Sequence, residues 1–379
     1  MNDWEEQRVA AALPTCRRIL VIKFKHIGDV LLATPLVRVL HENHPQATIS
    51  LLVIGTTGAV LEGNPLIACV WRYERGDGLV PLLTLYRWLY RSRFDLVIDL
   101  SGGGDRGAIC TWVTQARDRF GHLKTRVPWY RNLINRLAYN RLQPEPDHEH
   151  HTILRDLAMV APLHLGYDRL SVTLPVLAGS RKKVNTLLVG KGISEATAIC
   201  VIHPTSRWMF KCPPPGTMAQ VADALWEQHG LRVVFTCADN PVEKNYIAKV
   251  MGAVRSAPLS LGGQLELQEM AALLARAVLY VGVDTAPSHM AAALDIPSVV
   301  IFGPTKPHLW GPWPNGTLQQ PYPRGGGHHQ AGHHRICRMD WACVPCDRDG
   351  CDGSKVSRCL IEMTVEEIMA SIPWSKVGV

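Results

Sequence analysis

The sequence predicts an α/β protein in which two domains each hold a doubly wound, parallel β-sheet. Short apolar runs bounded by turn residues recur along the chain and are typical of buried parallel strands. Helix-forming segments separate these runs at the spacing of strand–helix–strand units. The chain of 379 residues is also long enough for two domains with a core each.

Composition and charge narrow the class of protein. Hydrophobic residues make up 47% of the chain and charged residues 19%, as in ordered globular proteins. The formal net charge of +7 fits an anionic substrate or a membrane surface. Apolar runs stay short of the roughly 18–20 residues that a transmembrane helix needs. Acids near the start replace the basic region of an export signal, and eleven scattered cysteines favour a reducing compartment, so we expect a cytoplasmic protein.

The first half is predicted to alternate strands and helices. Strands are expected at 17–24, 48–54 and 96–100, and helices at 30–42, 79–93 and 152–163. Residues 25–29 form a loop directly after the first strand. The triple glycine at 102–104 lacks the spacing of a dinucleotide loop and the lysine of a nucleoside-triphosphate loop. We interpret it as a turn that lets the backbone approach a neighbour closely.

A basic segment spans residues 106–141. It holds eight Lys or Arg residues against one acid, Asp118, with Trp129, Tyr130 and Tyr139 interleaved. Such a composition fits an ordinary solvated face, a phosphorylated glycolipid or a nucleic acid. The charge is local and no nucleic-acid motif accompanies it, so we expect no nucleic-acid partner. The histidines at 148, 150 and 151 lack matched ligands and are interpreted as a surface loop.

The second half repeats the strand–helix order after a Pro- and Gly-containing boundary at 174–183. Strands are expected at 198–202, 231–236, 278–283 and 298–302, and helices at 216–229, 242–251, 265–276, 290–294 and 364–372. Thr364 is the expected N-cap of the last helix. The stretch 278–304 is predicted to form a strand, a polar turn, a short helix and a second strand. In such a unit the turn lies at the carboxyl end of the sheet, where the N–H groups of a helix start attract phosphate.

Three polar loops at predicted strand ends hold the candidate chemistry. They comprise Gly28 and Asp29; Thr205, Ser206 and Lys211; and the residues from Asp284 to His289. A carboxylate on one sheet, with a lysine and a helix start on another, suits sugar transfer from a nucleotide diphosphate. The base takes a proton from the acceptor hydroxyl, and the cation and N–H groups stabilise the departing diphosphate. Each residue also has an ordinary alternative role as a cap, a turn residue or a solvated lysine.

Three stretches resemble the lipopolysaccharide heptosyltransferases of glycosyltransferase family 9. They are IKFKHIGDVLLATP, HPTSRWMFK and VGVDTAPSHMAAALDIPSVVIFGPT, and their order and spacing match the family from Arg17 to at least Trp313. The resemblance implies a GT-B fold, with two Rossmann-like domains facing a cleft. It also implies transfer of heptose with inversion at the anomeric carbon, without a metal and without any other cofactor. The Ala286-Pro287 form resembles the heptosyltransferase III branch.

The resemblance also implies roles for individual residues. The aspartate of the family's GD motif falls on Asp29, the general base, and Lys211 joins it as a catalytic residue that meets the phosphates. The positions implied to bind the donor are Thr205, Ser206, Asp239, Asp284, Thr285, Ser288 and His289. Pro287 removes one backbone N–H that would otherwise face a phosphate. In the basic segment we expect Lys124 and Arg126 to contact the acceptor.

The implied domains are an acceptor-binding domain at 1–178 and an ADP-sugar-binding domain at 179–357. The last segment, 358–379, is expected to pack back on the first domain. The implied donor is ADP-heptose, and the implied acceptor is a phosphorylated lipid A–core at the inner leaflet. The protein would then be cytoplasmic and peripheral at the inner membrane.

Five cysteines crowd the end of the chain, at 337, 343, 346, 351 and 359. Thiolates at such spacings can close a tetrahedral zinc site, and an oxidised chain could form disulfides. We expect free thiols in a loop and no metal site.

Two further function classes stay open on the sequence. A transferase of the same fold could use another nucleotide sugar, and a non-catalytic module could bind sugar nucleotides or glycans. Asp29 separates the enzyme from the binding module, because a module that only binds needs no carboxylate at the cleft. A nicotinamide dehydrogenase is disfavoured, because no GxGxxG follows a predicted strand.

Overall fold

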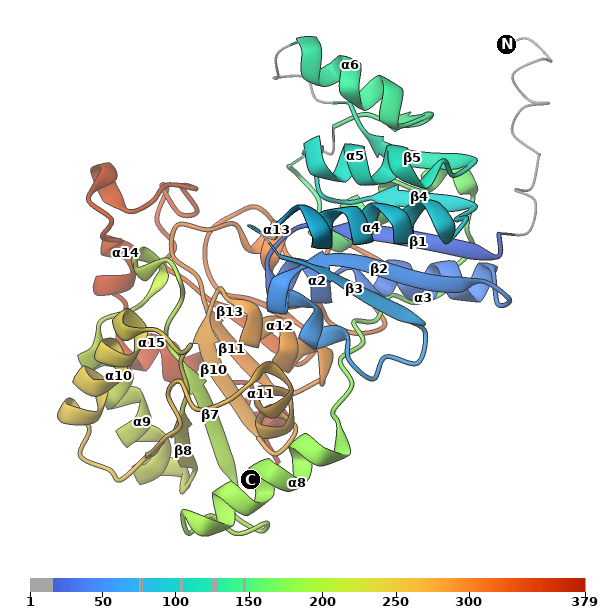
Figure 1. Ribbon diagram of the computed structural model, residues 1–379. Helices are drawn as coiled ribbons and strands as arrows, with labels where there is room; N and C mark the ends of the chain where they lie inside the picture. The colour runs from blue at the N-terminus through green and yellow to red at the C-terminus, as the bar shows by residue number, and fades with distance from the viewer. Residues whose placement is uncertain are drawn as a thin grey trace. The chain divides into compact units, whose positions relative to one another are not determined.

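The computed structural model describes residues 16–74, 76, 78–102, 105–123, 129–145 and 148–378, without the side chains of 129–131. The chain divides into two compact units. The first consists of Met1–Gly58, Asn64–Asp147 and Ile153–Asp168, and the second of Ala59–Gly63, His148–Thr152 and Arg169–Val379. Each unit has its own sheet with helices around it (Figure 1). The predicted α/β class with two parallel-sheet domains is confirmed.

The first unit has a six-stranded sheet in the order β3-β2-β1-β4-β5-β6. All its neighbouring strands pair in parallel. The strands are β1 (Arg18–Lys23), β2 (Thr48–Ile54), β3 (Cys69–Tyr73), β4 (Leu96–Asp99), β5 (Asp118–His122) and β6 (Arg141–Gln143). The order runs outward from β1 in both directions, so the sheet switches direction between β1 and β4. Ligands of doubly wound sheets bind at the carboxyl ends of strands at such a point.

Helices cover both faces of this sheet. They are α2 (Ile27–Leu31), α3 (Thr34–Asn43), α4 (Leu79–Arg91), α5 (Asp105–Thr114), α6 (Trp129–Ala138) and α7 (Thr152–Ala158), with 3-10 turns η1 (Gly55–Leu61) and η2 (Ala161–Leu163). Leu85 and Leu89 of α4 pack on Leu20 and Ile22 of β1. Figure 1 shows α3 on the opposite face. Because both faces are covered, the buried positions 19–22 of β1 are all apolar, as the sequence predicted.

The second unit has a seven-stranded sheet in the order β12-β13-β11-β10-β7-β8-β9. Its strands are β7 (Ile199–His203), β8 (Arg232–Phe235), β9 (Leu259–Ser260), β10 (Leu279–Val283), β11 (Ser298–Ile301), β12 (His329–Ala331) and β13 (His334–Cys337). Edge strand β12 pairs antiparallel with β13, and the other pairs are parallel. A Cβ on Gly282 would lie 2.9 Å from the carbonyl oxygen of His203, so glycine permits the close approach of β10 to β7.

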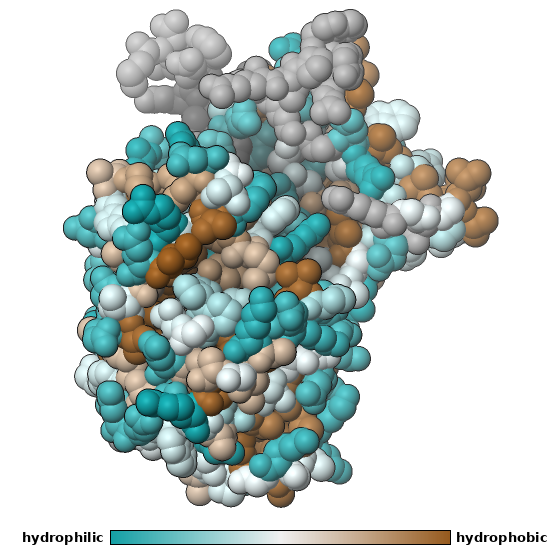
Figure 2. Space-filling view, turned by 90° about the vertical axis from the view of Figure 1, so that its left-hand side faces the viewer, coloured by the Kyte–Doolittle hydropathy of each residue, from teal (hydrophilic) through white to brown (hydrophobic). Residues whose placement is uncertain are grey.

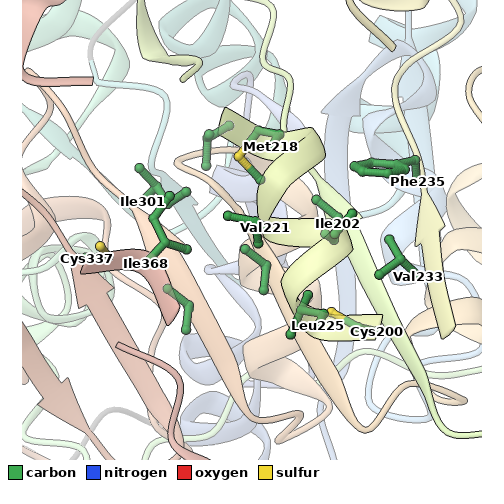
Figure 3. Close-up of a cluster of buried hydrophobic side chains, with 14 of the residues drawn as sticks. Cys200, Ile202, Met218, Val221, Leu225, Val233, Phe235, Ile301, Cys337 and Ile368 are labelled. Carbon is green, nitrogen blue, oxygen red and sulfur yellow. The ribbon is translucent and has the colours of Figure 1, made fainter. Parts of the chain in front are cut away.

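The helices of the second unit follow the same doubly wound plan. They are α8 (Ala178–Gly190), α9 (Pro215–His229), α10 (Pro241–Ala253), α11 (Leu267–Leu274), α12 (Ala286–Ala293), α13 (Pro307–Trp310), α14 (Arg358–Ile361) and α15 (Val365–Ala370), with 3-10 turns η3 (Met209–Lys211), η4 (Cys351–Gly353) and η5 (Trp374–Lys376). Figure 3 shows Met218, Val221 and Leu225 of α9 packed on Cys200 and Ile202 of β7.

The end of the chain contributes side chains to the core of the second unit. Ile368 of α15, with Ile372 and Val377 beyond it, lies in the same core as α9 (Figure 3). These side chains build the core of the second unit, and the expected packing of 358–379 on the first domain stays a prediction. A short amphipathic helix needs an apolar face to cover, and its sequence does not say which one. The capping box of Thr364 with Glu367 is present as expected.

The cysteine-rich end of the chain has free thiols throughout. Cys337 lies in the core, where its thiol faces Met363 Sδ at 3.7 Å. Burial, reinforced by the thiols of Cys351, Cys346 and Cys343, raises the pKa of Cys359 to about 11. Within the described ranges, His, Cys, Asp and Glu side chains form no group of three that could hold a metal ion. Likewise, no helix in that part of the chain is long and apolar enough to cross a membrane.

Candidate active site

Three neighbouring strands of the second sheet end in loops that hold polar side chains. β7 lies between β10 and β8, and all three are parallel. Their carboxyl ends therefore meet at one edge. Thr205 and Ser206 follow β7, and Asp284 follows β10 directly; Thr205 is fully buried and Asp284 is 7% exposed. The structure thus brings together two loops that the sequence singled out about 80 residues apart.

Lys211 and Asp284 form an ion pair at this edge. The Lys211 ammonium, at the end of η3, donates to Asp284 Oδ2 over 2.7 Å. The lysine side chain is 17% exposed and that of the aspartate 8%. Water screens such a pair less than a surface pair, yet the cation still reaches solvent. An anion that arrives at the edge would meet a lysine already held in position.

The start of α12 is fixed by a capping box between Thr285 and Ser288. Ser288 Oγ donates to the Thr285 carbonyl oxygen over 2.5 Å, and the Thr285 N–H donates to Ser288 Oγ over 3.4 Å. Pro287 occupies one of the first two helical positions, where it supplies no N–H. His289 is buried in the first turn. Because α12 begins directly after Asp284, its first N–H groups lie at the same edge as the Lys211–Asp284 pair.

Glu243 is a site residue that the sequence did not reveal. Its carboxylate accepts from Thr205 Oγ1 at 2.7 Å and from the Ala238 N–H at 3.1 Å on one oxygen, and from Asn240 Nδ2 at 2.8 Å on the other. Burial would raise its pKa, but these hydrogen bonds and the nearby His203 outweigh burial and lower it. Glu243 thus stays ionised and ties the loop after β8 to Thr205. An acid in the first turn of a helix looks like an ordinary favourable residue in sequence.

The other predicted residue of this loop, Asp239, lies at the surface. Its side chain is 74% exposed and pairs with Lys244. A Cβ on Gly263 would lie 3.3 Å from the Asp239 Cα, so the loop after β9 runs close beside it. Asp239 is therefore accessible to a ligand, but its carboxylate belongs to an exposed ion pair.

The stability of the protein is expected to fall as the pH drops from about 6.5 to about 4. Burial lowers the pKa of His203 and that of His334 to about 4 each. Burial likewise lowers the pKa of His44, His122 and His308. Between these values and the ordinary value of 6.5, the unfolded chain binds protons that the folded chain does not, so the free energy of unfolding rises with pH.

Urea unfolding between pH 4.5 and 7.5 measures this dependence. His334 suits the test, because its Nδ1 is hydrogen-bonded to Ser298 Oγ away from the polar loops. His334→Asn should give a shallower slope of free energy against pH, even if it lowers stability at pH 7.5. A parent protein equally stable at both ends of the range would contradict the burial of neutral histidines.

In the first unit, Asp29 stands in the first turn of α2, directly beyond the carboxyl end of β1. The sequence placed it in a loop before a helix at 30–42. In the structure that helix begins earlier and is interrupted, because Pro35 starts α3 anew. Lys25, between β1 and α2, reaches the end of β4: its Nζ is 3.8 Å from the position of a Cβ on Gly102. Gly102 has a φ of +75°, which confirms for this residue the predicted close turn after β4.

A buried ion pair joins β1 to α7 in the first unit. Lys23 Nζ, at the end of β1, donates to both carboxylate oxygens of Asp156 over 2.8 and 2.7 Å. Burial raises the pKa of Asp156; Lys23 opposes that shift, and the carboxylate of Asp29 adds to it. The negative charge of Asp29 therefore disfavours ionisation of Asp156. Lys23 and Asp156 thus tie β1 to α7, close enough to Asp29 for its charge to act on Asp156.

The chain also matches a known family. The model of "Glycosyltransferase family 9 (heptosyltransferase)" matches residues 82–320, more than half of the chain. The chain belongs to glycosyltransferase family 9. Asp29 precedes the matched region, whereas Thr205, Lys211, Glu243 and Asp284 lie within it.

Relatives of this family 9 chain agree in length and fold. Lipopolysaccharide heptosyltransferase 3 of Escherichia coli K12 is 29% identical over 307 residues, which cover 78% of this chain and 85% of the relative. A solved family 9 glycosyltransferase from Veillonella parvula superposes with a TM-score of 0.78 at 18% identity, over 97% of this chain and 99% of that one. The E. coli ADP-heptose heptosyltransferase II gives 0.71 at 18% identity, over 95% and 99%. The GT-B fold class is thereby confirmed.

The predicted acceptor residues of this glycosyltransferase, Lys124 and Arg126, lie outside the described residues. Part of the same basic segment is visible. Asp118 accepts from Arg117 Nε over 2.7 Å and from Arg141 Nε over 3.0 Å. Arg117 and Arg141, two of the eight cations of the segment, thus neutralise the buried carboxylate of Asp118 in β5 and have a structural role.

Proposed function

We propose that the protein is an inverting heptosyltransferase. It moves heptose from ADP-heptose to a heptose of the lipopolysaccharide inner core, as the heptosyltransferase III branch does. The observation that carries this proposal is the polar edge of the second sheet in a family 9 chain. There Lys211, held by Asp284, lies beside a helix start. This arrangement suits a diphosphate, because a cation and N–H groups together bind and stabilise its negative charge.

Donor binding is assigned to the second unit. Thr205, Ser206, Asp284, Thr285, Ser288 and His289 shape the pocket edge for the nucleotide sugar, and Asp239 contacts the nucleoside. Thr205 donates to Glu243, Asp284 accepts from Lys211, and Ser288 donates to the Thr285 carbonyl oxygen, so the loops are arranged before the donor arrives. Such preorganisation lowers the ordering cost of binding.

The acceptor is assigned to the first unit, with Asp29 as general base. Its carboxylate takes the proton from the acceptor hydroxyl as that oxygen attacks the anomeric carbon of heptose. The bond from that carbon to the diphosphate oxygen breaks at the same time, and ADP departs with the electron pair. Lys211 and the N–H groups of α12 stabilise the charge that develops on ADP. Attack from the face opposite the leaving group inverts the anomeric configuration.

A panel of nucleotide sugars, tested with a series of truncated lipopolysaccharide cores, measures this function. We expect turnover with ADP-heptose and with a core that already carries inner-core heptose. Turnover only with another nucleotide sugar would identify a transferase with a different donor. Binding of ADP-heptose without turnover on any core would identify a non-catalytic module.

Neutralising Lys124 and Arg126 together is expected to raise the KM for the acceptor and to flatten its salt dependence. Both residues stand in the basic segment, and the proposed acceptor is a phosphorylated glycolipid whose attraction to cations falls as salt rises. ADP affinity should not change, because we assign the donor to the other unit. The measurement is initial rate against acceptor concentration at low and high salt. If the double alanine variant has unchanged acceptor kinetics at low salt, the segment is an ordinary solvated face and does not bind the acceptor.

A further inference from the structure

Three successive helices of the first unit carry apolar side chains on the stripe that faces solvent. Large hydrophobic side chains with high exposure number seventeen in the part of the chain that the structure describes, and nine of them lie on α4, α5 and α6. These nine are Leu79, Val80, Leu83, Tyr90, Ile109, Trp112, Leu133, Ile134 and Leu137. Scattered exposed hydrophobics are normal, but a concentration on adjacent elements marks an interaction site.

On each helix the exposed residues follow helical spacing. In α4, Leu79, Leu83, Arg87 and Arg91 are four residues apart and exposed, whereas Leu85 and Leu89 on the inner side are buried. In α5, Arg106, Ile109 and Trp112 are three residues apart and exposed. In α6, Leu133, Arg136 and Leu137 are exposed. Each helix therefore has one stripe for the sheet and a second, partly apolar stripe for something outside the unit.

The three stripes belong to one surface. α5 contacts both α4 and α6, so the helices lie side by side. We call this surface the α4–α6 face. Figure 2 illustrates that hydrophobic residues, in brown, also come to the surface of this molecule. With Leu79 at 77% and Leu137 at 63% exposure, side chains on the first and third helices of the face are largely in water.

The charge of the α4–α6 face has a single sign on its outer stripes. Arg87, Arg91, Arg106 and Arg136 are all exposed there. The only acid in the three helices is Asp105, in the first turn of α5. Arg93, just beyond α4, stacks on the ring of Tyr90 at 5.4 Å. Arginine and aromatic rings beside aliphatic side chains are the composition of an interfacial, membrane-facing surface.

We propose that the α4–α6 face docks on the surface of an anionic phospholipid membrane. Its leucines, Ile109 and Trp112 enter the boundary between headgroups and acyl chains, and its arginines remain among the phosphates. A partner protein would be expected to offer acids and a shaped apolar patch, whereas a bilayer accepts a broad row of apolar side chains with cations among them. The α5 and α6 residues lie in the basic segment 106–141, but none of them is Lys124, Arg126 or an assigned donor residue, so this inference is tested separately from sugar transfer.

Co-sedimentation of the full chain with sucrose-loaded vesicles tests the proposal without any sugar substrate. One set of vesicles contains phosphatidylcholine alone, and the other has phosphatidylglycerol in about a third of its lipids. We expect binding to the anionic vesicles that weakens as salt is raised, and much weaker binding to the neutral ones. Trp112→Ser/Leu137→Ser should reduce partitioning on the anionic vesicles by about tenfold or more. Arg87→Gln/Arg91→Gln should also reduce it by about tenfold or more and should weaken its salt dependence.

Matched controls come from helices of the second unit. Val189 of α8 and Trp226 of α9 are exposed to a similar degree, and Arg181 and Lys182 of α8 are exposed cations. Val189→Ser/Trp226→Ser and Arg181→Gln/Lys182→Gln should bind vesicles as the parent does. Thermal unfolding measures whether each variant is folded. If the apolar variant does not fold, the charge variant still tests the proposal.

Three results would overturn the proposal. The first is a parent protein that fails to bind the anionic vesicles at low salt. The second is an equal loss of binding in the control variants. The third comes from sedimentation velocity: a parent dimer that becomes monomeric in the α4–α6 variants would show that a second copy of the chain covers this face instead.

Discussion

Asp29→Asn is expected to bind ADP with the affinity of the parent protein and to transfer sugar at least about a hundredfold more slowly. The amide keeps the shape of the side chain in the first turn of α2 but cannot take the proton of an acceptor hydroxyl. The loss should therefore appear in kcat and in kcat/KM alike, because the missing interaction is made only as the reaction proceeds. Calorimetry with ADP measures donor affinity, and initial rates with ADP-heptose and a truncated core measure transfer.

A matched control for this variant is Glu42→Gln. Glu42 is an exposed carboxylate on the next helix, α3, where it pairs with Arg38. The same change of charge in the same unit should leave the rate within about twofold, as expected for exposed ion pairs. Near-parental turnover in Asp29→Asn would assign the base to another group. Loss of ADP binding in that variant would mean that the substitution acts on the fold and not on proton transfer.

Much of the fold follows from burial patterns in the sequence. β2 was predicted with its observed bounds, and β1, β4, β7, β10 and β11 to within two residues at each end, because each is an apolar run buried on both faces. β5 and β6 escaped prediction for the opposite reason. β5 is the polar sequence DRFGH, and its Asp118 becomes acceptable inside only when Arg117 and Arg141 bind it. A tertiary ion pair of that kind leaves no local pattern.

Prediction of the candidate site shows the same division. Loops at the ends of parallel strands had to meet, so the proximity of Thr205, Lys211 and Asp284 could be foreseen from strand order alone. Glu243 could not, because its function depends on hydrogen bonds to Thr205 and Ala238 that only the folded loop creates. The same is true of Lys23 and Asp156, which are 133 residues apart in sequence.

The capped start of α12 refines what Pro287 does. The sequence suggested that this proline removes a phosphate-binding N–H. In the structure the Ser288 hydroxyl donates to the Thr285 carbonyl oxygen and accepts from the Thr285 N–H, so this hydroxyl is already engaged in the cap. In the proposed mechanism Lys211, which is paired with Asp284, therefore takes a larger share of diphosphate recognition.

Lys211→Ala is expected to weaken ADP binding by about 1.5–3 kcal/mol, the usual contribution of a hydrogen bond to a charged group, or roughly ten- to 150-fold in Kd. Two effects combine. The diphosphate loses a charge-assisted contact, and Asp284, with its side chain 8% exposed, loses the partner that neutralises it. An unpaired carboxylate would then repel the incoming diphosphate. Calorimetric titration with ADP measures the loss, and Lys211→Arg should recover part of it by keeping the charge.

A second variant separates these two effects. If repulsion by Asp284 matters, Lys211→Ala/Asp284→Asn should bind ADP better than Lys211→Ala alone, since the double variant has no carboxylate to repel the phosphates. The control is Lys183→Ala, which removes a lysine that pairs with Glu269 between α8 and α11. It should leave ADP affinity unchanged, because an exposed cation that is already paired with Glu269 is screened by solvent. Equal ADP affinity in the parent and in Lys211→Ala would exclude contact between this lysine and the diphosphate. Diphosphate recognition would then fall to the backbone N–H groups at the start of α12.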